Sequence, residues 1–272
     1  MKPTLLALDF DGVLCDGLPE YFETSWRVYR QMWSPASPIP APDLFTRFAR
    51  LRPVIETGWE MPVLLRALLL GFPEADLLEN WPILVRQITD SERMVPEELA
   101  TALDQTRDQW ITRDRPDWLG HHQFYPGVIA QLRSWLNRSL SLVIITTKEG
   151  RFVQELLQEQ QITIPEPQIY GKELGIAKRQ VLIHLLRGMA QSNGRQPQLW
   201  FVEDRLKTLF KIAAEEELSS LRLYLAEWGY TTAKDRQEAQ DSKRIQLLTL
   251  ADFTSDFSCW PEPRVPYEQS AI

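Results

Sequence analysis

Two aspartates, Asp9 and Asp11, follow an apolar run at residues 4–8 near the start of the chain. A short, unbroken apolar run is typical of a buried parallel strand, and open α/β sheets bind ligands at the carboxyl ends of such strands. Because the aspartates are two residues apart, both side chains project to the same side. Two carboxylates at one point repel each other unless a cation or a shared proton holds them, and Gly12 permits the tight turn that such a site needs. The alternative interpretation is an ordinary strand end followed by a D-x-D-G turn.

The composition excludes several classes of protein. The chain has 272 residues, is 44% hydrophobic and contains ten tryptophans, which is enough for a sizeable core in one or two domains. Its net charge of -7, without a Lys/Arg-rich tract, argues against nucleic acid or an anionic membrane as the main partner. The two cysteines, Cys15 and Cys259, form no C-x-x-C pattern, so neither a disulfide framework nor a zinc site is indicated. No apolar stretch approaches the ~20 residues of a membrane span, and the first apolar run is too short for a signal peptide, so we expect a cytoplasmic protein.

A long segment of helical character interrupts an otherwise alternating pattern of strands and helices. Helices are expected at 19–33, 44–51, 61–70, 75–89 and 96–112, with a Pro-rich break at 34–42. After residue 123, strands are expected at 141–145, 168–170, 199–202, 221–225 and 245–248, and helices at 128–137, 152–160 and 179–187. Alternating strands and helices predict a parallel sheet with right-handed crossovers. The expected fold is therefore α/β, a Rossmann-like parallel-sheet core formed by 1–16 and 123–272 with an inserted α-helical domain at 17–122.

Polar groups at three predicted strand ends have the chemistry that phosphoryl transfer requires. They are Asp9 and Asp11, Thr146 and Thr147, and Glu203 and Asp204, accompanied by a lysine that is either Lys178 or Lys172. Mg²⁺ prefers one or two carboxylates together with phosphate and water oxygens. An aspartate can act as a nucleophile and carry an aspartyl-phosphate, while a hydroxyl, a lysine and strand-end amides can hold the phosphoryl oxygens.

These groups, in this order, resemble the four motifs of the haloacid dehalogenase (HAD) superfamily, over about 1–16 and 123–252 of the chain. The first motif, D-x-D-G-[VT]-[LV], corresponds to residues 9–14, DFDGVL. The resemblance implies that Asp9 is the catalytic nucleophile and Asp11 the general acid/base. Dehalogenases of the family lack the second aspartate, and phosphonatases carry a small residue there, so Asp11 favours phosphate-ester chemistry.

The second and third motifs supply the phosphate-binding groups. An apolar strand ending in Thr146 resembles the second motif, which implies that Thr146, with Thr147 beside it, binds phosphate. Thr147-Lys148 stand where relatives often have Asn-Lys. The third motif is a lysine that neutralises the nucleophile and the phosphate. Lys178 resembles it best, and Lys172 is the alternative.

The fourth motif supplies metal ligands. Residues 201–204, FVED, resemble the family's apolar strand that ends in an acidic pair, which implies that Asp204 binds Mg²⁺ together with Asp9 and Asp11. The common pattern has a second Asp about four residues later, where this chain has Thr208. This departure affects one outer-sphere metal contact, for which Glu203 could compensate.

The helical insertion resembles a C1-type cap, because it lies between the first and second motifs. Such a cap closes over the site, excludes water and contacts the substrate. The candidate substrate-binding residues are Arg50, Arg52, Glu56 and Trp59, of which Arg52 and Glu56 are the preferred contacts. The alternative is an ordinary loop between helices with solvated charges.

The resemblance thus implies a phosphatase-branch protein, similar to phosphoglycolate phosphatases. The expected activity is Mg²⁺-dependent hydrolysis of a small phosphorylated metabolite through an aspartyl-phosphate intermediate. A phosphomutase or phosphotransferase of the same fold shares all of these core residues and stays open as an alternative. A second alternative, from another class, is a HAD-like binding or regulatory protein that has lost turnover.

Overall fold

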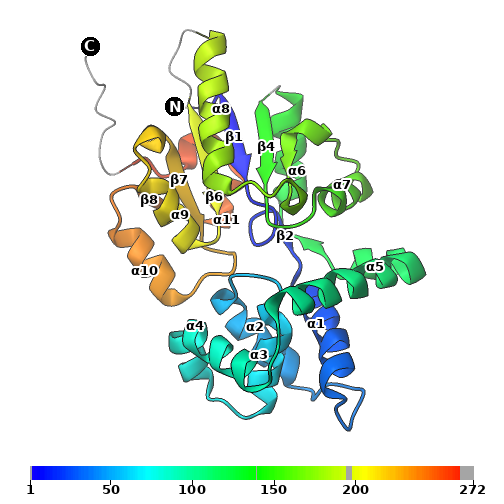
Figure 1. Cartoon of the computed structure of the whole chain (residues 1–272). Helices are drawn as coiled ribbons and strands as arrows, with labels where there is room; N and C mark the ends of the chain where they lie inside the picture. Colours follow the sequence, from blue (N-terminus) through cyan, green and yellow to red (C-terminus); the bar gives the residue numbers. More distant parts are fainter. Residues whose placement is uncertain (1, 139, 194–197, 264–272) are drawn as a thin grey trace. The chain divides into compact units, whose positions relative to one another are not determined.

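The computed structural model describes residues 2–138, 140–193 and 198–263. The chain divides into two compact units, which are an α/β unit of residues 1–16 and 124–272 and a helical unit of residues 17–123 (Figure 1). Each boundary between them lies within one residue of the boundary expected from the sequence. Among the helices of the described residues, none combines the length and the apolar character needed to cross a membrane.

A six-stranded parallel sheet forms the centre of the α/β unit and confirms the predicted fold class. Its strand order is β5-β4-β1-β6-β7-β8 (Figure 1). The strands are β1 (Leu5–Leu8), β4 (Ser141–Ile145), β5 (Ile169–Tyr170), β6 (Leu199–Glu203), β7 (Arg222–Ala226) and β8 (Ile245–Leu248). The strand expected at 245–248 lies at the edge of the sheet, as predicted.

Helices connect these strands in the way that parallel pairing requires. They are α6 (Val128–Asn137), α7 (Gly150–Glu159), α8 (Lys178–Asn193), α9 (Leu206–Ala213) and α10 (Ala233–Asp241), while α11 (Leu250–Phe253) follows the last strand. Two short strands, β2 (Cys15–Asp16) and β3 (Gln123–Phe124), stand at the two boundaries between the units.

The sheet is buried on both faces, which explains why its strands are continuous apolar runs. On one face, alternate strand residues such as Ala7 and Phe201 join a cluster with Leu182 of α8 and Leu209 of α9. On the other face, aromatic rings cover the sheet; they belong to Trp135, Trp200, Tyr224, Phe253, Phe257 and Trp260. This two-sided packing fixes the strand ends, and with them the polar residues that follow.

The helical unit contains α1 (Leu18–Trp33), α2 (Leu44–Leu51), α3 (Glu60–Leu69), α4 (Glu74–Ser91) and α5 (Pro96–Gly120). A buried ion pair joins α1 to α5, since Arg107 donates to Glu20 through Nε at 2.7 Å and through Nη2 at 3.3 Å. Thr24 Oγ1 donates to the same carboxylate at 2.7 Å. Burying a charged pair is costly unless hydrogen bonds satisfy it, and these contacts supply that compensation.

The prediction of the fifth helix, 96–112, omitted a second helical stretch that follows it. Helix α5 continues to Gly120 across a kink at Asp114, whose backbone leaves the helical region (φ -154°, ψ 76°). Beyond the kink a second helical stretch begins, because Asp114 Oδ1 accepts a hydrogen bond from the backbone N–H of Asp117 at 3.1 Å. Pro116 lies in the first turn of this stretch, where a missing N–H costs nothing.

Candidate active site

Three adjacent strands bring the predicted catalytic residues to one edge of the sheet. Strand β1 pairs with β4 on one side and with β6 on the other, and Leu8 lies opposite both Ile144 and Val202. The three strands therefore end at the same level. The residues that follow or end them are Asp9 and Asp11 after β1, Thr146, Thr147 and Lys148 after β4, and Glu203 and Asp204 at β6.

Lys178 links two of these strand ends. Its Nζ lies 2.8 Å from Asp9 Oδ2 and 2.7 Å from Glu203 Oε2. The Glu203 side chain is fully buried, and its other oxygen accepts hydrogen bonds from the backbone N–H groups of Asp204 and Arg205. Both oxygens of Glu203 thus accept hydrogen bonds, and the contact through Oε2 holds the Lys178 ammonium beside Asp9.

Burial and neighbouring charges shift the pKa values of these groups. Burial, and then the neighbouring charge of Glu203, raise the pKa of the Asp9 carboxyl to about 8, although Lys178 opposes the rise. Burial also raises the pKa of Glu203 and of Asp204. The pKa of Lys178 lies above its ordinary value, because its attraction to Asp9 and Glu203 outweighs the effect of burial. The site therefore holds more buried negative charge than one lysine neutralises, which favours binding of a cation.

The Asp204 carboxylate is positioned by a loop that follows β7. Its Oδ2 accepts a hydrogen bond from the backbone N–H of Tyr230 at 2.9 Å, and the Tyr230 hydroxyl donates to Asp16 at 2.8 Å. Gly12 and Gly229 approach so closely that a Cβ on either would overlap the site. On Gly12 it would lie 2.0 Å from Asp204 Oδ2, and on Gly229 it would lie 2.3 Å from the carbonyl oxygen of Gly12.

Gly12→Ala should reduce both stability and activity. Gly12 has φ +84°, and so does Gly71 in the helical unit, but no atom lies within 4 Å of a Cβ built on Gly71. Gly71→Ala is therefore a matched control that carries only the strain of the left-handed backbone, about 1–2 kcal/mol. Gly12→Ala adds the clash with Asp204, roughly 1–3 kcal/mol more. Urea unfolding of both variants measures the difference, and equal losses would show that the contact with Asp204 does not matter.

Asp11 lies beside Lys148, a lysine that was not predicted as a site residue. Lys148 Nζ is 3.2 Å from Asp11 Oδ1, and its side chain is only 6% exposed. The turn after β4 aims this lysine, because the Lys148 backbone N–H donates to Thr146 Oγ1 at 3.1 Å. Thr146 is buried, whereas Thr147 beside it is exposed. The sequence signal for Lys148 was the Thr147-Lys148 pair at the place where relatives often have Asn-Lys.

The two candidate motif lysines differ sharply in environment. Lys178, the first residue of α8, has its side chain only 13% exposed and contacts Asp9. Lys172 is exposed, in a short 3₁₀ segment before α8. This geometry favours Lys178 as the lysine that neutralises the predicted nucleophile.

Asp9, Glu203 and Asp204 form a buried acidic group that fits a metal ion. Each offers a carboxylate oxygen, and these oxygens all lie within 4.8 Å of one another. Donors occupy both oxygens of Glu203 and likewise both oxygens of Asp9, which accept from the Phe10 backbone N–H and from Lys178, so donor occupancy does not choose between these two as ligands. Asp11 was also predicted as a ligand, but its carboxylate is not among this group and instead faces Lys148. Thr208 lies on α9 and adds no carboxylate.

The candidate substrate residues lie around a loop of the helical unit. The carboxylate of Glu60 organises this loop by accepting hydrogen bonds from the backbone N–H of Glu56 and of Thr57, both at 3.2 Å. Glu56 is exposed. The Arg52 guanidinium lies 5.1 Å from the centre of the Tyr21 ring, whereas Arg50 binds Glu74 through two hydrogen bonds.

Comparison with known proteins identifies the fold. No protein-family model and no curated protein matches the sequence. Three similar solved structures cover nearly the whole chain. A protein from Lactobacillus delbrueckii subsp. bulgaricus, provisionally described as a phosphoglycolate phosphatase, has a TM-score of 0.59 and 13% identity, covering 96% of this chain and 100% of its own.

The other two structures give the same picture. A protein from Bacteroides fragilis, provisionally described as a haloacid dehalogenase-like hydrolase, has a TM-score of 0.56 and 16% identity, with coverage of 93% and 100%. A predicted phosphatase from Clostridium acetobutylicum has a TM-score of 0.56 and 14% identity, with coverage of 93% and 97%. At these identities the likeness is one of fold. The chain therefore has the fold of the haloacid dehalogenase-like proteins.

Proposed function

We propose that this protein is a Mg²⁺-dependent phosphatase that hydrolyses a small phosphorylated metabolite through an aspartyl-phosphate on Asp9. The observation that carries the proposal is the pairing of Asp9 with Lys178, 2.8 Å apart. Asp9 and Asp11 follow β1, and Asp204 follows the adjacent strand β6. Buried carboxylates of this kind perturb one another's pKa values, as functional sites commonly do. The fold shared with proteins described as phosphatases supports the same conclusion.

The proposed reaction has two steps. First, the Asp9 carboxylate attacks phosphorus, the bond from phosphorus to the leaving oxygen breaks, and Asp11 gives a proton to that oxygen. Second, Asp11 takes a proton from a water molecule, whose oxygen attacks the aspartyl-phosphate, so that inorganic phosphate leaves and the Asp9 carboxylate is restored. Lys148 positions Asp11 for both transfers through their 3.2 Å contact.

The remaining residues of the site neutralise and orient the phosphoryl group. Lys178 increases the ionised fraction of Asp9 that is available for attack, because it opposes the burial and the Glu203 charge that together raise the pKa of this carboxyl to about 8. Thr146 and the amides of its turn are placed to hold phosphoryl oxygens. Asp9 and Asp204 would hold Mg²⁺, which supplies positive charge that offsets the carboxylates and the phosphoryl oxygens.

Activity should depend on a divalent cation. The test is hydrolysis of p-nitrophenyl phosphate after EDTA treatment and again after addition of excess Mg²⁺, with loss and recovery expected. Asp204→Asn should need a higher Mg²⁺ concentration for half-maximal rate, because it weakens one direct ligand from a second strand. Full activity in EDTA would contradict the proposed metal site, and no phosphate release from any phosphomonoester would contradict the proposed function.

The helical unit is proposed to act as the cap that selects the substrate. Core groups that hold only phosphate and metal cannot distinguish one leaving group from another, so selection requires residues outside the core. Arg52 and Glu56 are the proposed contacts, on the loop that Glu60 organises. A screen of phosphorylated metabolites, beginning with 2-phosphoglycolate because of the structure described with that activity, identifies the substrate class.

A further inference from the structure

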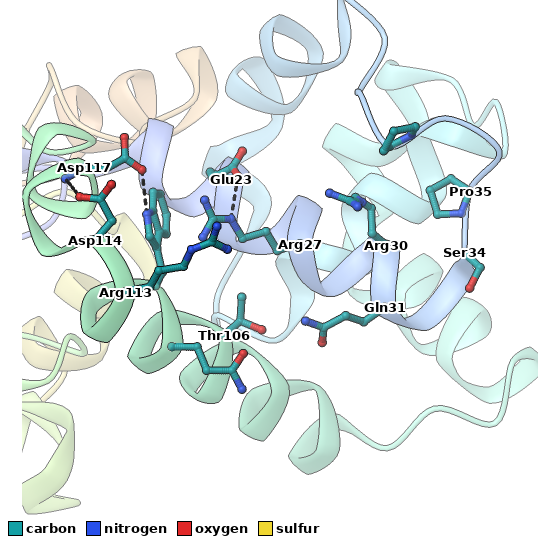
Figure 2. Close-up of a pocket in the computed structure, with 13 residues that line it drawn as sticks. Glu23, Arg27, Arg30, Gln31, Ser34, Pro35, Thr106, Arg113, Asp114 and Asp117 are labelled. Carbon is teal, nitrogen blue, oxygen red and sulfur yellow. Dashed lines mark hydrogen bonds and ion pairs between the residues drawn. The ribbon is translucent and has the colours of Figure 1, made fainter.

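A cavity of about 860 Å³ lies within the helical unit and shares no residue with the candidate active site (Figure 2). Its walls come from α1, from the loop that follows α1 at residues 34–38, and from α5 around the kink at Asp114. The volume falls in the range of about 300–1,000 Å³ that small-molecule sites occupy.

The acidic residues of the cavity are already satisfied by donors within it. Arg27 donates to Glu23 at 2.7 Å, and Trp110 Nε1 donates to Asp117 Oδ2 at 2.8 Å. The carboxylate of Asp114 accepts the backbone N–H of Asp117. These carboxylates are therefore poor candidates for binding a cationic ligand, and their contacts fix the walls instead.

The basic residues of the cavity differ in their pairing, since Arg27 already donates to Glu23. Arg30 and Arg113 both line the cavity and are exposed, and within the described part of the chain neither forms an ion pair. Figure 2 shows Arg27 of α1 and Arg113 of α5 pointing toward each other, with Arg30 about one turn farther along α1. The Arg27 guanidinium stacks over the Trp110 ring, 3.9 Å from its centre. Stacking holds this cation in place before any ligand arrives, which lowers the entropic cost of binding.

We propose that this cavity binds a small organic anion that carries two or more phosphate or carboxylate groups. Guanidinium groups match the planar, paired acceptors of both chemistries, and Arg30 of α1 and Arg113 of α5 would each engage one acidic group of the ligand. Gln31, Gln109 and Thr106 also line the cavity and offer neutral donors to the rest of the ligand. The site is separate from phosphate-ester hydrolysis and does not depend on that proposal.

Arg30→Gln/Arg113→Gln should bind such anions at least tenfold more weakly than the wild type, because each substitution removes a charge-assisted hydrogen bond. The measurement is titration calorimetry of the full chain, stripped of metal with EDTA and then dialysed free of the chelator, with two probes, inorganic pyrophosphate and citrate. The probe that binds more tightly distinguishes a phosphate from a carboxylate ligand. The matched control is Arg86→Gln/Arg93→Gln, two exposed arginines of the same unit that form no ion pair among the described residues. The control loses the same charge and should bind within twofold of the wild type.

Hydrogen exchange locates the bound probe. Pyrophosphate or citrate should slow exchange in peptides that cover residues 30–38 and 109–117. Protection confined to residues 9–16 and 146–150 would place the anion at the candidate active site and overturn the proposal. Equal weakening in both double variants, or no saturable binding of either probe, would overturn it as well. Unchanged urea unfolding midpoints in the variants would show that a loss of binding does not result from a loss of folding.

Discussion

Asp9→Asn is expected to abolish phosphatase turnover while leaving the fold intact. An amide is not a competent nucleophile toward phosphorus, so no aspartyl-phosphate forms, and the loss should be on the order of 10⁴-fold or more. The substitution preserves the shape of the side chain and removes a buried charge whose pKa is raised to about 8, so stability should not fall sharply. The measurement is the rate of phosphate release from p-nitrophenyl phosphate with Mg²⁺, together with a urea unfolding curve.

Asp16→Asn is the matched control for this experiment. Asp16 belongs to the same segment of the α/β unit, but its carboxylate accepts a hydrogen bond from the Tyr230 hydroxyl and is not part of the acidic group. An amide oxygen can accept the same hydrogen bond, so this variant should keep activity within about tenfold. If Asp9→Asn retained activity within tenfold of the wild type, the nucleophile would have to be another residue.

The sequence predicted the sheet and the strand-end residues well, because both rest on local patterns. The apolar runs that became β1, β4 and β6 are unbroken, and parallel pairing brings their polar ends together whatever the helices between them do. The strand expected at 141–145 and the helices expected at 44–51 and 128–137 have the bounds that the structure gives β4, α2 and α6.

The features that the sequence did not predict depend on contacts between distant residues. The pairing of Lys148 with Asp11 joins positions 137 residues apart, and no local pattern shows which charged side chains will meet. The function of Glu203 in holding Lys178 was missed for the same reason. The helical stretch after the kink of α5 was not predicted; Pro116 lies in its first turn, which Asp114 caps.

The structure also bears on Thr208, which stands where the family's common pattern has a second Asp. A missing carboxylate on α9 matters less when Asp204 is already oriented from another side, by the Tyr230 backbone N–H at 2.9 Å. Gly12 and Gly229 permit this approach, since a side chain on either would collide with the site. Positioning of the fourth-motif aspartate is thus shared between β6 and the loop after β7.

Lys178→Met is the second variant with a large expected effect, and Lys172→Met is its control. Lys178 contacts Asp9 through a 2.8 Å ion pair. Its loss leaves the raised pKa of Asp9 unopposed, so a smaller fraction of the nucleophile is ionised, and it removes charge stabilisation of the phosphoryl group. Together these effects should lower kcat/KM by roughly 10²- to 10³-fold. Lys172 is exposed, and its substitution should change kcat/KM less than threefold.

The pH profile distinguishes this role from a purely structural one. Without Lys178 the ionised form of Asp9 is less favoured, so the acidic limb of the kcat/KM profile should move to higher pH, and raising the pH should restore part of the activity. A variant that merely loosens the fold would lose activity at every pH and would show a lower urea midpoint. If Lys172→Met lost the activity and Lys178→Met kept it, the motif lysine would lie in the loop before α8, and the contact between Lys178 and Asp9 would be only an ion pair that stabilises the fold.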